Sequence, residues 1–163
     1  MILIGLGGNL ASAVGAPQAT LAAALAALER EGVRVTARSR WYRSAPVPRS
    51  DQPDFVNAAV AVETALDPRA LLALLHGIEA RFGRIRGAAN AARTLDLDLL
   101  AYRGGVSAGD DGGPILPHPR LHERAFVLLP LAEIAPDWRH PLLNRSVREL
   151  VAVLTPGQDA APL

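Results

Sequence analysis

Two segments in the first half of the chain alternate apolar and polar or small side chains with a period of two. In residues 33–42, valine and alanine alternate with arginine and threonine. In residues 55–64, one face carries Val56, Ala58, Val60 and Val62, and the other carries Phe55, Asn57, Ala59 and Ala61. Because successive side chains of a strand point to opposite faces, both segments are predicted to be strands. Two more continuously apolar runs, residues 1–6 and 93–102, predict buried strands.

Apolar residues at helical spacing predict two helices between these strands. Residues 17–31 begin with Pro17, which suits a first helical turn, and Gly32 is a natural stop. Asp67 is a helix cap before a second helix that Gly83 ends. A third helix is expected over residues 124–136, starting anew or kinking at Pro130. A last helix follows over residues 146–153, and the tail 158–163 is expected to fray.

The order of these elements predicts the fold. Strand–helix–strand–strand–helix–strand is the ferredoxin-like pattern, an α+β fold with an antiparallel sheet and helices packed on it. The later helices predict an elaboration of this pattern to three layers, α-β-α. The chain has 163 residues and no visible boundary, so we expect a single domain over residues 1–163.

Composition narrows the classes of partner and chemistry. Seventeen basic residues, all arginine, stand against 16 acidic ones, so there is no basic footprint for nucleic acid. The absence of lysine removes Schiff-base and Walker-type lysine chemistry, and the absence of cysteine removes disulfides and thiol catalysis. The longest apolar run, residues 21–28, is too short to cross a membrane, and no signal peptide is visible. These features predict a soluble, cytoplasmic protein without a nucleic-acid or membrane partner. We expect a monomer, although the sequence does not determine the oligomeric state.

Two carboxylates interrupt the apolar run that follows Arg93. Asp96 and Asp98 are two residues apart on a predicted strand, so they stand about 6.6 Å apart along one face. That arrangement suits two oxygen-seeking cations held jointly with substrate phosphates. An edge strand with a solvated acidic face is the alternative that the pattern leaves open.

Other polar groups suggest chemistry without deciding it. Phe55 and Asn57 together suit the binding of a flat heterocycle, because the phenyl ring can stack on it and the amide can form hydrogen bonds with its edge. The alternative is that Asn57 is an ordinary surface residue near the start of a strand. The glycine- and arginine-rich stretch 84–92 suits a phosphate clamp and lid, or a solvated linker. Residues 5–9 look like a glycine-rich turn, but Leu10 replaces the third glycine of a dinucleotide-binding fingerprint. His118 and His122 have the i, i+4 spacing of two metal ligands on a helix, but Pro119 disfavours a helix at this point.

Several motifs together resemble one family, the 6-hydroxymethyl-7,8-dihydropterin pyrophosphokinases, over essentially the whole chain. They are Gly7-Gly8-Asn9-Leu10, Tyr42-Arg43-Ser44-Ala45-Pro46, Asp51-Gln52-Pro53-Asp54-Phe55-Val56-Asn57-Ala58-Ala59-Val60, Gly83-Arg84-Ile85-Arg86, Arg93-Thr94-Leu95-Asp96-Leu97-Asp98, Pro117-His118 and Pro130-Leu131-Ala132-Glu133-Ile134-Ala135-Pro136. The blocks that contain Phe55 and Asp96 are the most specific. The resemblance implies transfer of diphosphate from ATP to the hydroxymethyl group of a reduced pterin, in folate synthesis.

The same resemblance implies roles for individual residues. Asp96 and Asp98 would bind two Mg²⁺ ions, and Arg84 and Arg93 would be catalytic and hold the phosphates. The pterin site would comprise Ser44, Ala45, Val47, Phe55, Asn57 and Phe126. The ATP site would comprise Glu79, Arg84, Arg86, Arg93, His118 and Arg124.

The lid departs from the family pattern. Residues 87–92 are Gly-Ala-Ala-Asn-Ala-Ala, one residue shorter than usual and without the customary tryptophan. A ferredoxin-like binding module without turnover is therefore one alternative. Another two-magnesium nucleotidyltransferase is a second, although it leaves Phe55, Asn57 and Phe126 unexplained.

Overall fold

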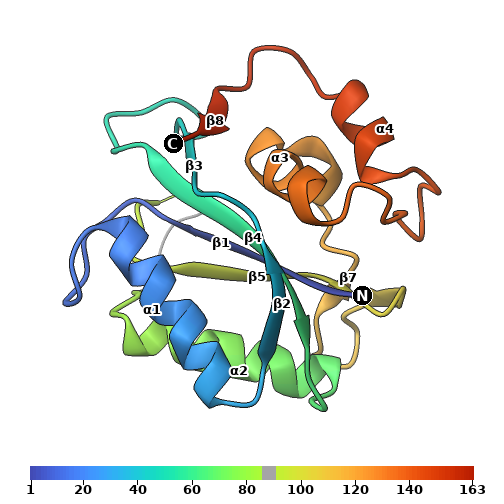
Figure 1. Ribbon diagram of the computed structural model, residues 1–163, viewed down its shortest axis with the longest axis horizontal. Helices are drawn as coiled ribbons and strands as arrows, with labels where there is room; N and C mark the ends of the chain where they lie inside the picture. Colours follow the sequence, from blue (N-terminus) through green and yellow to red (C-terminus); the bar gives the residue numbers. More distant parts are fainter. Residues whose placement is uncertain (86–90) are drawn as a thin grey trace.

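A six-stranded antiparallel sheet forms the middle layer of the computed structural model, which describes residues 1–85 and 91–163 (Figure 1). Its strands, in spatial order, are β5 (Asp96–Tyr102), β1 (Ile2–Gly8), β4 (Phe55–Glu63), β3 (Tyr42–Ser44) and β8 (Ala160–Pro162), and β2 (Arg34–Arg38) also pairs with β4. With β3 and β8 set aside, the spatial order β5-β1-β4-β2 is that of a ferredoxin-like sheet. The predicted α+β fold class is therefore confirmed.

Helices cover both faces of the sheet (Figure 1). On one face lie α1 (Pro17–Arg30) and α2 (Pro68–Arg81), and on the other lie α3 (Ala125–Ile134) and α4 (Val147–Ala152). A short helix, η1 (Leu121–Glu123), precedes α3, and β6 (Ser107–Ala108) pairs with β7 (Ile115–Leu116) in a separate ribbon. The three-layer arrangement follows from this distribution.

The alternating side chains of β4 divide the apolar core into two clusters. Ala58, Val60 and Val62 pack with leucines of α1 and α2, whereas Ala59 and Ala61 pack with leucines of α3 and α4. Both faces of β4 are buried because each one meets a helical layer, and the strand predicted over residues 55–64 is confirmed. Burial of each valine or leucine side chain in these clusters contributes about 1.5–3 kcal/mol, so the two clusters hold the strand in its place.

Most predicted element boundaries are confirmed within two residues. Asp67 caps α2 by accepting the Ala70 N–H at 2.8 Å, and Ser146 forms a capping box with Glu149 at the start of α4. Helix α3 continues through Pro130 without interruption, so it does not start anew there.

Three local expectations were wrong. The segment 33–42 is two strands, because β2 ends at Arg38 and β3 begins only at Tyr42. Residues 5–8 are part of β1 rather than a turn, since β4 pairs with all four of them and β5 pairs with residues 5–7. The tail does not fray: β8 pairs with β3, and the Leu163 N–H donates to the Trp41 carbonyl at 3.0 Å.

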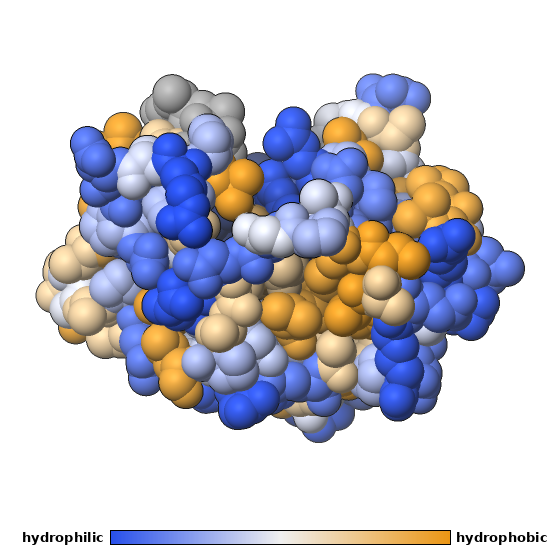
Figure 2. Space-filling view, turned by 90° about the horizontal axis from the view of Figure 1, so that it is seen from above, coloured by the Kyte–Doolittle hydropathy of each residue, from blue (hydrophilic) through white to orange (hydrophobic). Residues whose placement is uncertain are grey.

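The face of the molecule that Figure 2 shows combines polar residues with an apolar area. Seen from above in Figure 2, charged and polar residues dominate, and apolar residues gather near the middle of this face. Within residues 1–85 and 91–163, the helices are all too short or too polar to cross a lipid bilayer.

Candidate active site

The register of the three central strands creates a hollow on the face that α3 covers. Gly7 in β1 lies opposite Asn57 of β4 on one side and opposite Asp96 of β5 on the other. Gly5 is opposite Asp98 in the same way. Because glycine has no side chain, an open floor separates the amide on β4 from the carboxylates on β5.

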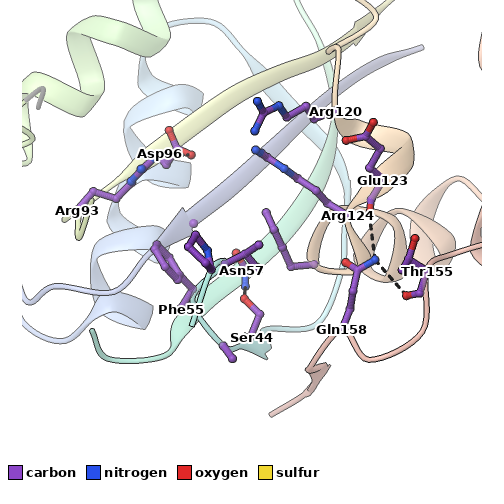
Figure 3. A pocket seen from close by; sticks show the side chains of 15 residues that line it. Ser44, Phe55, Asn57, Arg93, Asp96, Arg120, Glu123, Arg124, Thr155 and Gln158 are labelled. Atoms are coloured by element: carbon purple, nitrogen blue, oxygen red, sulfur yellow. Dashed lines mark hydrogen bonds and ion pairs between the residues drawn. The ribbon is translucent and has the colours of Figure 1, made fainter. Parts of the chain in front are cut away.

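A cavity of about 430 Å³ occupies this hollow. Its lining contains nine of the predicted site residues: Ser44, Ala45, Val47, Phe55, Asn57, Arg93, Asp96, Arg124 and Phe126. Figure 3 shows that they come from opposite walls, with Asp96 and Arg93 on one side, Arg124 on another, and Phe55, Asn57 and Ser44 near the base. The predicted residues among them come from segments up to 82 residues apart, from Ser44 to Phe126.

One side of the cavity combines an oriented amide with aromatic rings. The Asn57 Nδ2 donates to the Ser44 Oγ at 2.7 Å, and the Asn57 side chain is buried. A Cβ on Gly7 would lie 3.0 Å from the Asn57 Oδ1, so that oxygen sits directly over the glycine. Phe55 and Phe126 are half-buried and both line the cavity. This side can bind a flat ring by stacking and by hydrogen bonds to its edge.

The other side is a cluster of arginines and carboxylates around Asp96. The Arg84 Nη1 lies 2.6 Å from the Asp96 Oδ1 and 2.5 Å from the Glu79 Oε2, and the Arg93 Nη1 lies 3.4 Å from the Asp96 Oδ2. Burial alone would lower the pKa of Arg84, but Asp96 and Glu79 outweigh it and raise that pKa. The guanidinium is therefore firmly cationic and fixed in place.

Glu79 of α2 holds Arg84 and the backbone of β5 in this cluster. Its side chain is 3 % exposed, and its Oε2 also accepts the backbone N–H of Leu97 at 2.8 Å. Glu79 thus ties α2 to β5 and to Arg84, and it is absent from the cavity lining. The predicted contact of Glu79 with a nucleotide stays a prediction, and the placement favours a supporting role.

The two carboxyl groups of β5, Asp96 and Asp98, lie close enough for their charges to interact. Asp96 and Asp98 both line a second, small pocket beside the main cavity, on the same face as Leu100. Burial, followed by the negative charges of Asp96 and Glu79, raises the pKa of Asp98 to about 7. Among the described residues, no three metal-binding side chains gather. Two carboxylates fit Mg²⁺ nonetheless, because this ion completes its shell with water and substrate phosphates.

A buried asparagine fixes Arg93. The Asn9 Oδ1 accepts the Arg93 backbone N–H at 2.9 Å, and the Asn9 N–H donates to the Arg93 carbonyl at 2.9 Å. The Asn9 Nδ2 donates to Gln52 and to the Pro53 carbonyl, just before Phe55. Arg93 precedes β5, which begins at Asp96, so the strand predicted over residues 93–102 starts three residues later than expected. Sequence reasoning gave Asn9 no role, although its place after two glycines marked the segment.

The remaining predicted residues take different positions. His118 is partly buried outside the cavity lining, and its Nδ1 accepts the Arg120 N–H at 3.2 Å. Burial, reinforced by the charge of Arg124, lowers the pKa of His118, so this imidazole is neutral at pH 7. Arg86 and most of the predicted lid, residues 86–90, lie outside the described residues.

The cavity also has lining residues that sequence reasoning missed: Gly7, Pro48, Arg120, Glu123, Thr155 and Gln158. Arg120 and Arg124 extend side by side toward the β5 side of the cavity (Figure 3). Burial, with the charge of Arg120 adding to it, lowers the pKa of Arg124. Two neighbouring guanidinium groups in a cavity favour an anionic ligand.

The fold and the cavity define a class: an α+β domain with a ring-and-amide subsite beside a carboxylate-and-arginine subsite. The family model described as 7,8-dihydro-6-hydroxymethylpterin-pyrophosphokinase (HPPK) matches residues 3–136. The chain belongs to this family.

Similar proteins agree with the family match. A 2-amino-4-hydroxy-6-hydroxymethyldihydropteridine pyrophosphokinase of Methylorubrum extorquens is 45% identical, over 94% of this chain and 93% of its own length. Proteins of the same name from Synechocystis and Pseudomonas aeruginosa are 41% and 42% identical, over 91% and 93% of this chain and 73% and 90% of theirs.

Solved structures share the fold at low sequence identity. Wild-type HPPK-DHPS of Plasmodium falciparum matches with a TM-score of 0.68 at 14% identity, and its A437G variant with STZ-DHP matches with 0.73 at 15%. Each match covers 93% of this chain and 44% of the solved chain. The present chain thus spans less than half of those longer proteins, in which the same fold occurs.

Proposed function

We propose that this protein transfers diphosphate from ATP to 6-hydroxymethyl-7,8-dihydropterin, forming AMP and the pterin diphosphate in folate biosynthesis. The observation that carries the proposal is one cavity that holds Phe55, Asn57 and Phe126 together with Asp96 and arginine side chains. The names of the relatives that are 41–45% identical support it.

In this proposal the ring subsite binds the pterin. Phe55 and Phe126 stack on the ring, and Asn57 bonds its edge, assisted by Ser44 and by the backbone of Ala45 and Val47. The Ser44–Asn57 hydrogen bond uses one amide proton of Asn57, which leaves the Oδ1 over Gly7 to accept from the ring. Stacking and bonding together would orient the hydroxymethyl group toward the β5 side of the cavity.

The opposite subsite binds the triphosphate. Asp96 and Asp98 hold two Mg²⁺ ions, which supply charge neutralisation of the phosphate oxygens when bound. Arg84 and Arg93 bind phosphate oxygens and are the catalytic cations, and Arg86, Arg124 and His118 contact ATP, with Glu79 supporting Arg84. Arginine suits this task because its planar group can pair two phosphate oxygens at once.

The reaction needs positioning more than covalent help from the protein. The hydroxymethyl oxygen attacks the β-phosphorus, the bond from that phosphorus to the α–β bridging oxygen breaks, and AMP leaves with the electron pair. The hydroxyl proton goes to solvent or to a phosphate oxygen. The ring subsite holds the nucleophile, and the arginines stabilise the charge that develops on the phosphoryl oxygens.

The decisive experiment mixes the protein with MgATP and reduced 6-hydroxymethylpterin and identifies the nucleotide product. AMP that forms only when the pterin is present supports diphosphate transfer. ADP would point to an ordinary kinase or ATPase, and no turnover with ATP still bound would favour a binding module. The monomeric state and cytoplasmic location stay predictions, and sedimentation of the purified chain tests the first of them.

A further inference from the structure

The C-terminal segment, residues 155–163, lies against two walls of the cavity. Strand β8 pairs with β3, which carries Ser44, and the Ala45 N–H donates to the Asp159 carbonyl at 3.1 Å. Asp159 also pairs with Arg43 at 3.0 Å. The family match ends at residue 136, so it assigns nothing to this segment. The segment is nevertheless part of the site, because Thr155 and Gln158 line the cavity.

The amide of Gln158 binds the two peptide groups that flank Arg124. The Gln158 Oε1 accepts the Ala125 N–H at 2.8 Å, and the Gln158 Nε2 donates to the Glu123 carbonyl at 3.0 Å. The Nε2 also donates to the Thr155 carbonyl at 3.4 Å, which anchors the amide in its own segment (Figure 3). One side chain therefore restrains the backbone on both sides of Arg124.

Arg124 depends on outside help for its conformation. It is the N-cap of α3, with φ −112° and ψ 117°, and its own side chain makes no capping hydrogen bond. Helix N-termini have unpaired N–H groups, and the Gln158 oxygen satisfies one of them. Extended backbone at residue 124 directs its guanidinium into the cavity, beside Arg120 and over the Phe126 ring at 5.4 Å.

We propose that Gln158 is a positioning residue that holds the backbone of Arg124, and through it the Arg124 guanidinium, in the orientation that binds the phosphates of ATP. This inference rests on the proposed function for its kinetic consequence. Its structural half, the restraint of residue 124, is independent of any substrate. Gln158 itself need not touch the nucleotide, because it acts on the two peptide groups.

The first test replaces the amide by a thioether of similar shape, Gln158→Met, with the exposed Gln18→Met of α1 as the matched control. Methionine loses all three hydrogen bonds of the Gln158 amide, two of which hold the peptide groups of Arg124. Loss of these two is expected to lower kcat/KM for ATP about tenfold (about 1.4 kcal/mol), mainly through KM, while the KM for the pterin stays within twofold. Gln158→Glu keeps the acceptor for Ala125 but turns a carboxylate oxygen toward the Glu123 and Thr155 carbonyl oxygens, so it should lower kcat/KM for ATP at least as much as Gln158→Met. The control should match wild type.

A double-mutant cycle separates positioning from general stabilisation. If Gln158 acts through Arg124, Gln158→Met should add almost nothing to the loss caused by Arg124→Gln, because the guanidinium to be positioned is already gone. Fully additive losses, or wild-type KM for ATP in Gln158→Met, would overturn the proposal. If Gln158→Met unfolds, Gln158→Glu combined with Arg124→Gln decides the same question.

Amide hydrogen exchange tests the restraint without turnover. The Ala125 N–H should exchange at least tenfold faster in Gln158→Met than in wild type, while amides in the middle of α3 are unchanged. Equal exchange at Ala125 would refute the restraint. If wild type forms no AMP, the proposed function fails, and the exchange measurement still decides whether Gln158 holds this backbone.

Discussion

Replacing Gly7 by alanine tests the floor of the cavity with one methyl group. The new Cβ would lie 3.0 Å from the Asn57 Oδ1, about 0.4 Å closer than ordinary van der Waals contact begins, and its next neighbour is the Val56 carbonyl at 3.8 Å. Gly7 does not need positive φ, so the backbone accepts alanine without strain. The methyl group must therefore displace the amide of Asn57.

The expected loss follows from the hydrogen bonds of that amide. When Asn57 is displaced, either the edge of the pterin ring or the buried Asn57 oxygen lacks a hydrogen-bond partner in the complex. Such an unpaired group costs about 2 kcal/mol, which corresponds to a loss of about 30-fold in pterin affinity. Calorimetric titration with 6-hydroxymethylpterin should show this loss, whereas titration with MgATP should match wild type. The melting temperature should stay close to wild type, because alanine in a strand costs less backbone entropy than glycine.

Two glycine variants serve as controls. Gly77→Ala places its methyl group in open space on α2 and should leave both affinities unchanged. Gly8→Ala brings its Cβ to 2.6 Å from the Thr94 carbonyl oxygen, a backbone atom, and should lower stability. If folded Gly7→Ala binds the pterin within twofold of wild type, the reasoning that Asn57 above Gly7 forms hydrogen bonds with the pterin ring is refuted.

Three further predictions concern single side chains. Asp96→Asn or Asp98→Asn should lower kcat at least about 10³-fold in the AMP-forming assay, because several kcal/mol of metal stabilisation are lost. Asn57→Ala should weaken pterin binding far more than ATP binding in paired calorimetric titrations. Burial opposes ionisation of Glu133, but hydrogen bonds from the Tyr42 hydroxyl and from the backbone and side chain of Arg40 outweigh it and lower the pKa of Glu133 below its usual 4.5. Glu133 therefore stabilises the fold above pH 4.5, and acid titration of unfolding should show that Glu133→Gln loses this contribution.

Each of these has a contradicting result. The exposed Asp111→Asn should be fully active, and near-normal turnover in either β5 variant would remove the two-metal assignment. If Asn57→Ala loses affinity for the pterin and for ATP equally, Asn57 does not belong to the ring subsite. A native group with a lowered pKa loses its stabilisation as pH falls, so the difference between wild type and Glu133→Gln must shrink below pH 4.5. A difference that persists unchanged at lower pH would contradict the ionic origin.

Local periodicity alone placed many side chains correctly. The alternation in residues 55–64 put Asn57 on the face opposite Val56, and the i, i+2 spacing put Asp96 and Asp98 on one face. Such patterns are reliable because neighbouring residues on a strand share a backbone geometry with a fixed period. The family motifs then predicted that these residues belong to one site, and nine of the predicted residues line the cavity.

What the chain order could not determine is which faces meet. That Asn57 faces Asp96 across Gly7 depends on the strand order β5-β1-β4, and a slip of one residue would turn Asp96 into the core. The Asn9–Arg93 and Gln158–Ala125 hydrogen bonds join residues 84 and 33 positions apart, with no periodic signal at either end. The sequence by itself thus determined most of the elements and which side chains share a face of β4 or β5, although it missed the break between β2 and β3 and the pairing of β8. Only the tertiary structure decided the open floor at Gly7 and the supports of Arg93 and Arg124, because register and long-range hydrogen bonds arise when the layers pack.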